Sequence, residues 1–208
     1  MTAKGRFISL EGGEGVGKST QLKALANALR ERGLEVVETR EPGGSEGAEA
    51  IRQILLRGDD GRWSIEAEAL LFAAARSDHL EKTIRPALER GAWVLSDRFI
   101  DSSLAYQGGA GGLGIERIRE LHEFATGGVF PDLSLVLTLN DGHERASARD
   151  RDSPDRIGGR GRDFHRKVDF AFRIIAAEEP DRVRLVDASG PEADVTERLV
   201  AAVAGLLP

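Results

Sequence analysis

The sequence contains no cysteine among its 208 residues. Disulfides, zinc–thiolate sites and thiol nucleophiles are therefore excluded, and the composition fits a reducing compartment. Long apolar runs are also missing, because no stretch approaches the roughly 20 residues that a membrane-spanning helix needs. Residues 1–6 are short and polar, unlike a signal peptide. We therefore expect a cytoplasmic protein with no membrane partner.

A basic surplus is absent as well. The chain has 29 lysines and arginines against 35 aspartates and glutamates, which gives a formal net charge of −6. Proteins that bind duplex nucleic acid usually carry a net positive charge, so we expect no nucleic-acid partner. Small phosphate ligands stay compatible with this balance, because local arginines decide such sites. None of the histidines has metal-ligand spacing with another: His79, His122, His143 and His165.

The chain does contain a regular alternation of strand and helix patterns. Short apolar runs predict strands at 7–11, 34–39, 92–96, 133–139 and 183–186. Helical spacing of apolar residues predicts helices at 18–32, 46–56, 65–89, 115–125, 141–149, 164–178 and 192–206. We expect Pro86 to kink or divide its helix and the glycine cluster 108–114 to be a loop. The alternation predicts one α/β domain over 1–208, a three-layer sandwich with a five-stranded, mostly parallel sheet.

One glycine-rich segment fits the phosphate-binding pattern G-x-x-x-x-G-K-[ST], with a predicted strand before it and a helix after it. The segment reads Gly12, Gly13, Glu14, Gly15, Val16, Gly17, Lys18 and Ser19. Glycines allow backbone N–H groups to turn toward anionic oxygens, and the helix N-terminus adds partial positive charge. We expect ATP to bind at residues 12–20, ending at Thr20, with Lys18 on the β- and γ-phosphates and Ser19 on Mg²⁺.

The P-loop alone does not identify the reaction. The residues at the ends of the later predicted strands reduce the number of possible reactions. The guanine-binding pattern of GTPases is absent, since the candidate strand end reads Leu139-Asn140-Asp141. The strand at 92–96 is followed by a single carboxylate, Asp97, which suits Mg²⁺, and by Arg98, which suits bidentate binding of a second phosphate. A helix cap or ion pair for Asp97, and a surface salt bridge for Arg98, stay open as alternatives.

Several blocks stand in the order found in the thymidylate kinases, and the chain resembles that family over nearly its whole length. The blocks are 12–19; Thr39-Arg40-Glu41-Pro42-Gly43-Gly44; Leu71-Phe72 with Arg76; 97–108; Phe130-Pro131-Asp132-Leu133; and Asp155-Arg156-Ile157. The resemblance implies transfer of the γ-phosphoryl group of ATP to dTMP, giving dTDP and ADP for dTTP synthesis in DNA replication. It also implies Mg²⁺ as cofactor and a homodimer.

The resemblance assigns roles at the acceptor. Asp97 would help to hold Mg²⁺, Arg98 would clamp the acceptor phosphate, Phe72 would stack on thymine and Arg76 would hydrogen-bond its edge. Positions 72 and 76 are four apart on a predicted helix, so both side chains can reach one ligand. Without the resemblance, Phe72 would be read as an ordinary core aromatic.

Further acceptor-site residues follow from the same resemblance. Tyr106, the only tyrosine, would lie against the sugar and disfavour a ribose 2′-hydroxyl, and Glu14 would face the 3′-hydroxyl. Pro42 would help to shape the base pocket. The other expected acceptor-site residues are Ser102, Ser103 and Gln107, with Arg40 and Arg52 as weaker candidates.

An arginine-rich segment follows the fourth predicted strand. Between Arg145 and Arg166 there are seven arginines against four aspartates. A flexible basic segment near a P-loop predicts a lid, at about 150–162, that closes over ATP, although several of these arginines fit solvated salt bridges equally well. Residues 13–16 contain no arginine, so the resemblance implies the class in which lid arginines act on the phosphoryl group. The candidates are Arg149, Arg151 and Arg156, followed by Arg160.

Two departures from the family pattern affect the details of lid closure. There is no arginine near Gly111, and Gly158 stands where an acidic residue commonly follows the Asp-Arg-Ile triplet. Two alternatives to dTMP phosphorylation also stay open. One is a related kinase for another acceptor, such as a deoxynucleoside or guanylate, and the other is a nucleotide-binding switch without turnover.

Overall fold

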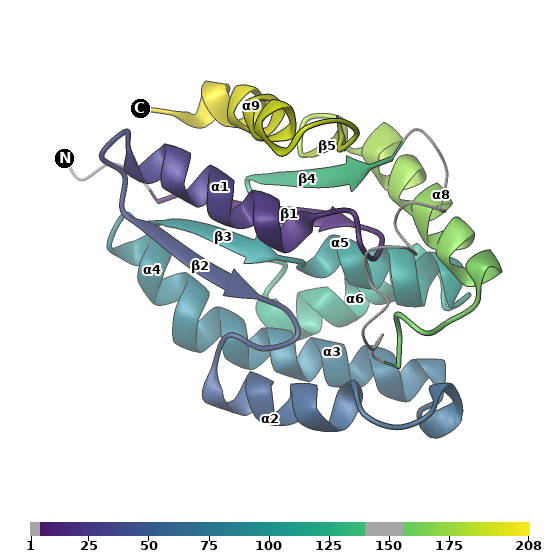
Figure 1. Cartoon of the computed structure of the whole chain (residues 1–208). Helices are drawn as coiled ribbons and strands as arrows, with labels where there is room; N and C mark the ends of the chain where they lie inside the picture. Colours follow the sequence, from purple (N-terminus) through teal and green to yellow (C-terminus); the bar gives the residue numbers. More distant parts are fainter. Residues whose placement is uncertain (1–4, 140–155) are drawn as a thin grey trace.

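A parallel sheet forms the centre of the computed structural model, which describes residues 5–139 and 156–208 (Figure 1). The strand order is β2-β3-β1-β4-β5, and each neighbouring pair is parallel. The strands are β1 (Phe7–Gly12), β2 (Val36–Arg40), β3 (Trp93–Asp97), β4 (Leu133–Thr138) and β5 (Val183–Asp187). The expected α/β fold with a five-stranded sheet is therefore confirmed, and all five strands lie where the apolar runs predicted them.

Alternate residues of the strands pack on opposite faces of the sheet. Phe7 and Val136 belong to the core cluster on one face, whereas Ile8, Leu95 and Leu135 belong to the cluster on the other. Successive side chains of a strand point to opposite sides, so a strand covered on both faces needs apolar residues at consecutive positions. This requirement explains the uninterrupted apolar run of β4.

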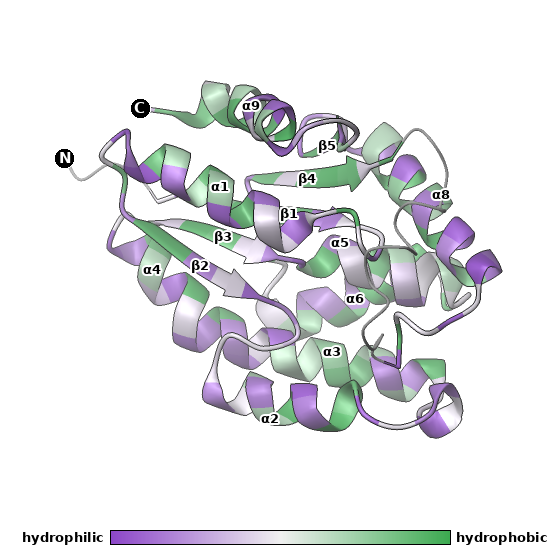
Figure 2. Ribbon diagram, in the orientation of Figure 1, coloured by the Kyte–Doolittle hydropathy of each residue, from purple (hydrophilic) through white to green (hydrophobic). Residues whose placement is uncertain are grey.

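Helices cover both faces (Figure 1). On one side lie α1 (Lys18–Arg30) and α9 (Glu192–Val203), and their apolar stripes belong to the same core cluster as Ile8. The other side carries α3 (Ile65–His79), α5 (Ile100–Ser103), α6 (Ile115–Thr126) and α8 (Arg162–Glu178). The helix α2 (Glu46–Leu55) packs against α3. Figure 2 shows the amphipathic result, with green bands on the strands and alternating purple and green bands on α2 and α8.

Short turns complete the element order. They are the 3₁₀ turns η1 (Asp60–Arg62) and η4 (Ala204–Leu206), the π-helical turns η2 (Leu80–Ile84) and η3 (Leu104–Ala110), and the short helix α4 (Arg85–Glu89). The helix predicted for 65–89 is thus divided into three pieces, and Pro86 lies at the start of the last one. Proline has no N–H and cannot continue the helical ladder, so the predicted interruption is confirmed.

The prediction of a loop over 108–114 is wrong in its first part, because η3 extends to Ala110. Gly108 and Gly109 lie inside this turn and allow neighbouring elements to approach. A Cβ atom on Gly109 would lie 2.6 Å from the Cβ atom of Ala171 in α8, and one on Gly108 would lie 3.2 Å from Cα of Ile115 in α6. Glycine serves close packing at these positions rather than turn formation.

Some predictions fall outside the described residues. The helix predicted at 141–149 and the first part of the lid segment, residues 150–155, lie there, together with Arg149 and Arg151. None of the helices in residues 5–139 and 156–208 is both long and apolar enough to cross a membrane.

Candidate active site

A cavity of about 680 Å³ opens at the carboxyl ends of β1, β2 and β3. Parallel α/β sheets bind ligands at this end, where the strand order branches to either side of the first strand. Most of the expected site residues line it: Glu14, Gly15, Val16, Gly17, Lys18, Ser19, Thr20, Arg40, Pro42, Arg52, Phe72, Arg76, Asp97, Arg98, Ser102, Ser103, Tyr106 and Gln107. Packing thus brings together residues that lie far apart in the sequence.

The P-loop connects β1 to α1. Gly17, at φ 93°, precedes the first residue of α1 in a left-handed conformation that favours glycine. The ammonium group of Lys18 donates to the carbonyl oxygens of Gly13 at 2.5 Å and Gly12 at 3.4 Å. Burial and the neighbouring Arg98 lower the pKa of Lys18 to about 8. The loop therefore holds a buried cation beside the helix N-terminus, an arrangement suited to anionic oxygens.

Ser19 and Asp97 form a pair of oxygen groups at the edge of the cavity. The Ser19 hydroxyl donates to Oδ2 of Asp97 at 2.6 Å, so the first turn of α1 meets the end of β3. Within residues 5–139 and 156–208, no group of three or more His, Cys, Asp or Glu side chains is placed to hold a metal ion. The pair fits a hard cation such as Mg²⁺, which takes one or two protein ligands and completes its shell with phosphate and water.

Arg98 lies between the P-loop and η3 and has an unusual backbone. Its φ is 72°, and it is the one non-glycine residue with positive φ in the described part of the chain. Nη1 donates to the Gly12 carbonyl at 2.9 Å and to the Ser102 hydroxyl at 3.1 Å, while Nη2 donates to Glu14 at 2.5 Å. The guanidinium also lies 5.1 Å from the centre of the Tyr106 ring. Strained backbone of this kind is frequent where a side chain must be aimed at a ligand.

The charge of Arg98 controls its neighbours. It is the main cause that lowers the pKa of Glu14 to about 2, so Glu14 is ionised at neutral pH. Burial opposes the charge of Arg98, but Glu14, Tyr106 and Asp97 outweigh burial and raise the pKa of Arg98. Burial likewise raises the pKa of Tyr106, which keeps its phenol protonated. The site therefore holds an arginine whose carboxylate partner an anionic ligand could replace.

Glu11 supports the turn that carries Arg98, and the sequence analysis did not identify it. It is fully buried, and its carboxylate accepts the Phe99 N–H at 2.8 Å and the Ser102 hydroxyl at 2.5 Å. Burial, and then the charge of Asp101, raise the pKa of Glu11 to about 7. The available signal was a lone acidic residue at the end of an apolar strand.

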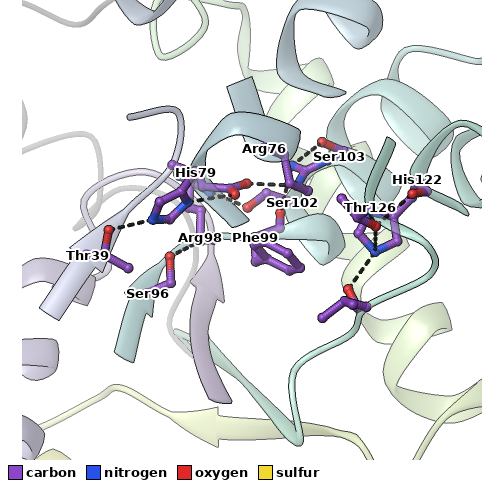
Figure 3. Close-up of polar contacts among 12 residues, drawn as sticks. Thr39, Arg76, His79, Ser96, Arg98, Phe99, Ser102, Ser103, His122 and Thr126 are labelled. Carbon is purple, nitrogen blue, oxygen red and sulfur yellow. Dashed lines mark hydrogen bonds and ion pairs between the residues drawn. The ribbon is translucent and has the colours of Figure 1, made fainter. Parts of the chain in front are cut away.

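Arg76 stands at the other end of the cavity, one helical turn from the partly exposed Phe72. Its Nε donates to Glu41 at 2.8 Å, and its Nη2 donates to the Ser103 hydroxyl at 2.8 Å (Figure 3). Glu41 comes from the segment after β2 and is buried. The i, i+4 prediction is confirmed to the extent that both side chains line one cavity, while their contacts with a ligand stay predictions.

The sequence Arg-Glu-Pro-Gly-Gly begins at Arg40, the last residue of β2, and continues into the segment that follows the strand. Arg40 pairs with Glu49 at 3.2 Å, and the Pro42 carbonyl accepts from Arg52 at 2.7 Å. A Cβ atom on Gly44, at φ +83°, would lie 2.4 Å from side-chain atoms of both His79 and Thr39. The segment can therefore follow the cavity wall only with glycine at position 44.

The described end of the lid segment is held by a buried carboxylate. Glu68 of α3, at 0 % exposure, accepts from Arg156, from Arg160 at 2.8 Å and from the Gln107 amide at 2.8 Å. Arg156 also donates to the Leu55 carbonyl at 3.1 Å and does not line the cavity. In this structure Arg156 is a buried link between α2 and α3, and its action on the phosphoryl group stays a prediction. No local sequence signal marks Glu68, because its partners lie 39 to 92 positions away.

A wall of the cavity that the sequence analysis missed comes from the end of the chain. Gln21 of α1 meets the loop and first turn of α9, where Ala188, Gly190, Glu192 and Val195 also line the cavity. The Gln21 amide donates to the Glu192 carbonyl at 3.0 Å. This wall adjoins the P-loop, on the side away from Phe72 and Arg76.

Comparisons with known proteins agree with this architecture. The family model described as "Thymidylate kinase" matches residues 10–199. The thymidylate kinase of Rhizorhabdus wittichii is 59 % identical over 98 % of this chain and 99 % of its own length. That of Caulobacter vibrioides is 49 % identical over 89 % of each chain. The crystal structure of thymidylate kinase from Ehrlichia chaffeensis matches with a TM-score of 0.79 and 29 % identity, covering 97 % of this chain and 99 % of that one. The chain belongs to the thymidylate kinase family.

Proposed function

We propose that this protein transfers the γ-phosphoryl group of ATP to dTMP, giving dTDP and ADP, in dTTP synthesis for DNA replication. One observation carries the proposal. A single cavity joins a P-loop at Lys18 and Ser19 to a pocket lined by Phe72 and Arg76, with Arg98 between them. A donor phosphate chain and a nucleoside monophosphate can therefore meet at Arg98.

The donor end takes the triphosphate. The residues proposed for ATP are Gly12, Gly13, Glu14, Gly15, Val16, Gly17, Lys18, Ser19 and Thr20. Backbone N–H groups and Lys18 bind the phosphate oxygens, since loop and helix N-terminus act together. Ser19 and Asp97 would hold Mg²⁺, which when bound neutralises charge on the transferring group.

The acceptor end binds dTMP. Phe72 stacks on the base, Arg76 hydrogen-bonds its edge, and Tyr106 lies against the sugar. The remaining proposed contacts are Arg40, Pro42, Arg52, Ser102, Ser103 and Gln107. The acceptor phosphate displaces Glu14 from Arg98, because a dianion competes with a carboxylate for the same guanidinium. Glu14 is then free to accept from the 3′-hydroxyl.

Catalysis rests on position and charge rather than on a strong base. A phosphate monoester is already anionic near neutral pH, and the barrier is the approach of two anionic groups. Lys18 and Arg98 offset that repulsion, and the lid arginines Arg149, Arg151 and Arg156 are proposed to complete it. For Arg156 this role requires the side chain to leave Glu68, so Arg149 and Arg151 are the stronger candidates.

An acceptor panel tests the function. ADP release is measured with ATP and each of dTMP, dUMP, dCMP, GMP and AMP, and we expect the highest kcat/KM with dTMP. Saturable turnover of GMP without dTMP would favour the alternative acceptor. ATP binding with no turnover of any acceptor would favour a nucleotide-binding switch.

We also propose that the protein is a cytoplasmic homodimer. Leu70 on α3 is 59 % exposed and Phe124 on α6 is 89 % exposed. These two helices contact each other, so large apolar side chains face solvent on adjacent elements. Such exposure is typical of surfaces that a partner covers.

A further inference from the structure

A continuous chain of polar contacts leads from Thr39 through His79 to Arg76 (Figure 3). The Thr39 hydroxyl lies 2.6 Å from Nε2 of His79, and Nδ1 of His79 lies 3.1 Å from Oε1 of Glu41. The other oxygen of Glu41 accepts from Nε of Arg76 at 2.8 Å. The side chains of His79, Glu41 and Arg76 are at most 3 % exposed. The chain therefore ties β2 to the arginine proposed to read the base.

Two of the three guanidinium nitrogens of Arg76 form hydrogen bonds with other described residues, and the third does not. Nε binds Glu41, and Nη2 binds the Phe99 carbonyl at 3.3 Å and the Ser103 hydroxyl at 2.8 Å. Within residues 5–139 and 156–208, Nη1 has no hydrogen-bond partner, and no buried side-chain nitrogen or oxygen lacks one. Nη1 is therefore accessible, and Arg76 lines the cavity.

The planar shape of the guanidinium determines the direction in which Nη1 donates. A guanidinium is a rigid fork, so fixing Nε and Nη2 also fixes where Nη1 points. Glu41 in turn cannot rotate freely, because each carboxylate oxygen has its own donor. Nδ1 of His79 must carry a proton to donate a hydrogen bond to Glu41. Nε2 of His79 forms the hydrogen bond with the Thr39 hydroxyl.

We propose that Glu41 is a positioning residue that makes Arg76 select the acceptor base, with His79 as its support. A fixed N–H donor binds a ring carbonyl oxygen, but it rejects an amino group at the same place, because two donors would face each other. The site would then prefer 4-oxo pyrimidines over 4-amino pyrimidines. This inference rests on the proposed function.

The test compares dUMP with dCMP, because neither carries a 5-methyl group and they differ at position 4. In Glu41→Gln we expect the ratio of their kcat/KM values to fall about tenfold, the size expected when a buried charge-assisted hydrogen bond is lost. The KM for dTMP should rise by a similar factor, while kcat and the KM for ATP change less than about threefold. The control Glu38→Gln removes an arginine-paired carboxylate of the neighbouring strand β2, bound to Arg30 at 2.6 Å and outside the cavity. This variant should keep the ratio.

His79 provides a second route that does not alter Glu41. In His79→Asn the amide nitrogen takes the place of Nδ1 and should preserve the dUMP/dCMP ratio, whereas His79→Leu should lower it. A folded Glu41→Gln protein with an unchanged ratio would overturn the proposal, and so would His79→Leu behaving like His79→Asn. If the unaltered protein phosphorylates dTMP and the variants keep the ratio, only this inference fails. If the unaltered protein phosphorylates none of the acceptors, the proposed function itself fails.

Discussion

At the scale of single residues, Arg98 combines a strained backbone with the most connected side chain of the site. Replacing it with alanine should lower kcat at least about 100-fold, because the acceptor phosphate loses its charge partner during transfer. ATP affinity should change less than about threefold, since Lys18 and the P-loop backbone remain. Steady-state kinetics and calorimetric titration with ATP measure both quantities, with Arg90→Ala, an exposed arginine paired with Glu35, as the matched control.

Alanine at φ 72° is itself strained, so a second variant is needed. Arg98→Gly removes the same guanidinium but tolerates the backbone conformation. We expect it to be as inactive as Arg98→Ala. Recovery of turnover in the glycine variant would show that backbone strain caused the loss and would contradict the phosphate-clamp role.

Glu11 gives a prediction about pH. Its pKa is raised from 4.5 to about 7 in the fold, so between these values the folded protein keeps a proton that the unfolded chain has released. Stability should therefore fall as pH rises through this window, by at most about 1.4 kcal/mol per pH unit for one group. Glu11→Gln still accepts the Phe99 N–H but cannot titrate, and should flatten the slope. Urea unfolding at pH 5, 6, 7 and 8 measures it, and an unchanged slope would contradict the assignment.

The residues that the sequence identified are those whose chemistry is local. Lys18 and Ser19 follow from one short motif, and Asp97 with Arg98 from one strand end. Glu11, Glu41 and Glu68 were missed as positioning residues because their partners lie 35 or more positions away. The sequence does not indicate which distant residues these glutamates contact, because the contacts form only when the helices pack on the sheet.

At the scale of elements, all five strands were predictable: β1, β3 and β4 contain apolar runs, and β2 and β5 are short segments rich in valine. The end of η3 was not, because glycine is read as a turn former wherever its packing neighbour is unknown. The approach of α6 to Gly108 and of α8 to Gly109 explains why a helical turn contains two glycines.

The close approach of η3 to α8 predicts a reciprocal rescue. Gly109→Ala should cost about 1–3 kcal/mol of unfolding free energy, because its new Cβ would lie 2.6 Å from that of Ala171. Ala171→Gly alone should cost about 1 kcal/mol through helix propensity. The double variant should lose less unfolding free energy than the sum of the losses in the two single variants. A double-mutant cycle measured by urea unfolding tests this. Gly205→Ala, with no atom within 4 Å of the added Cβ, is the control, and strict additivity at 109 and 171 would contradict the packing explanation.

At the scale of the whole molecule, the acidic net charge and the basic site coexist. The formal charge is −6, yet Lys18, Arg40, Arg52, Arg76 and Arg98 all line one cavity. Fold topology makes this possible, because parallel strands place the loops after β1, β2 and β3 at one edge. Overall composition could not reveal that these five cationic side chains share one cavity.

The exposed apolar side chains allow a choice between two possible dimer surfaces. Phe124 belongs to α6, which contacts α3 with its exposed Leu70, whereas Phe170 on α8, 65 % exposed, has Asp163, Arg166 and Lys167 around it. An apolar surface over two helices is the better interface, so Phe124→Glu should convert a dimer into a monomer by burying an unpaired charge. Phe170→Glu should leave the dimer intact. Light scattering coupled to gel filtration measures the mass, and unfolding temperatures should confirm that both variants are folded. A dimeric Phe124→Glu protein, or a monomeric Phe170→Glu protein, would place the interface away from α6.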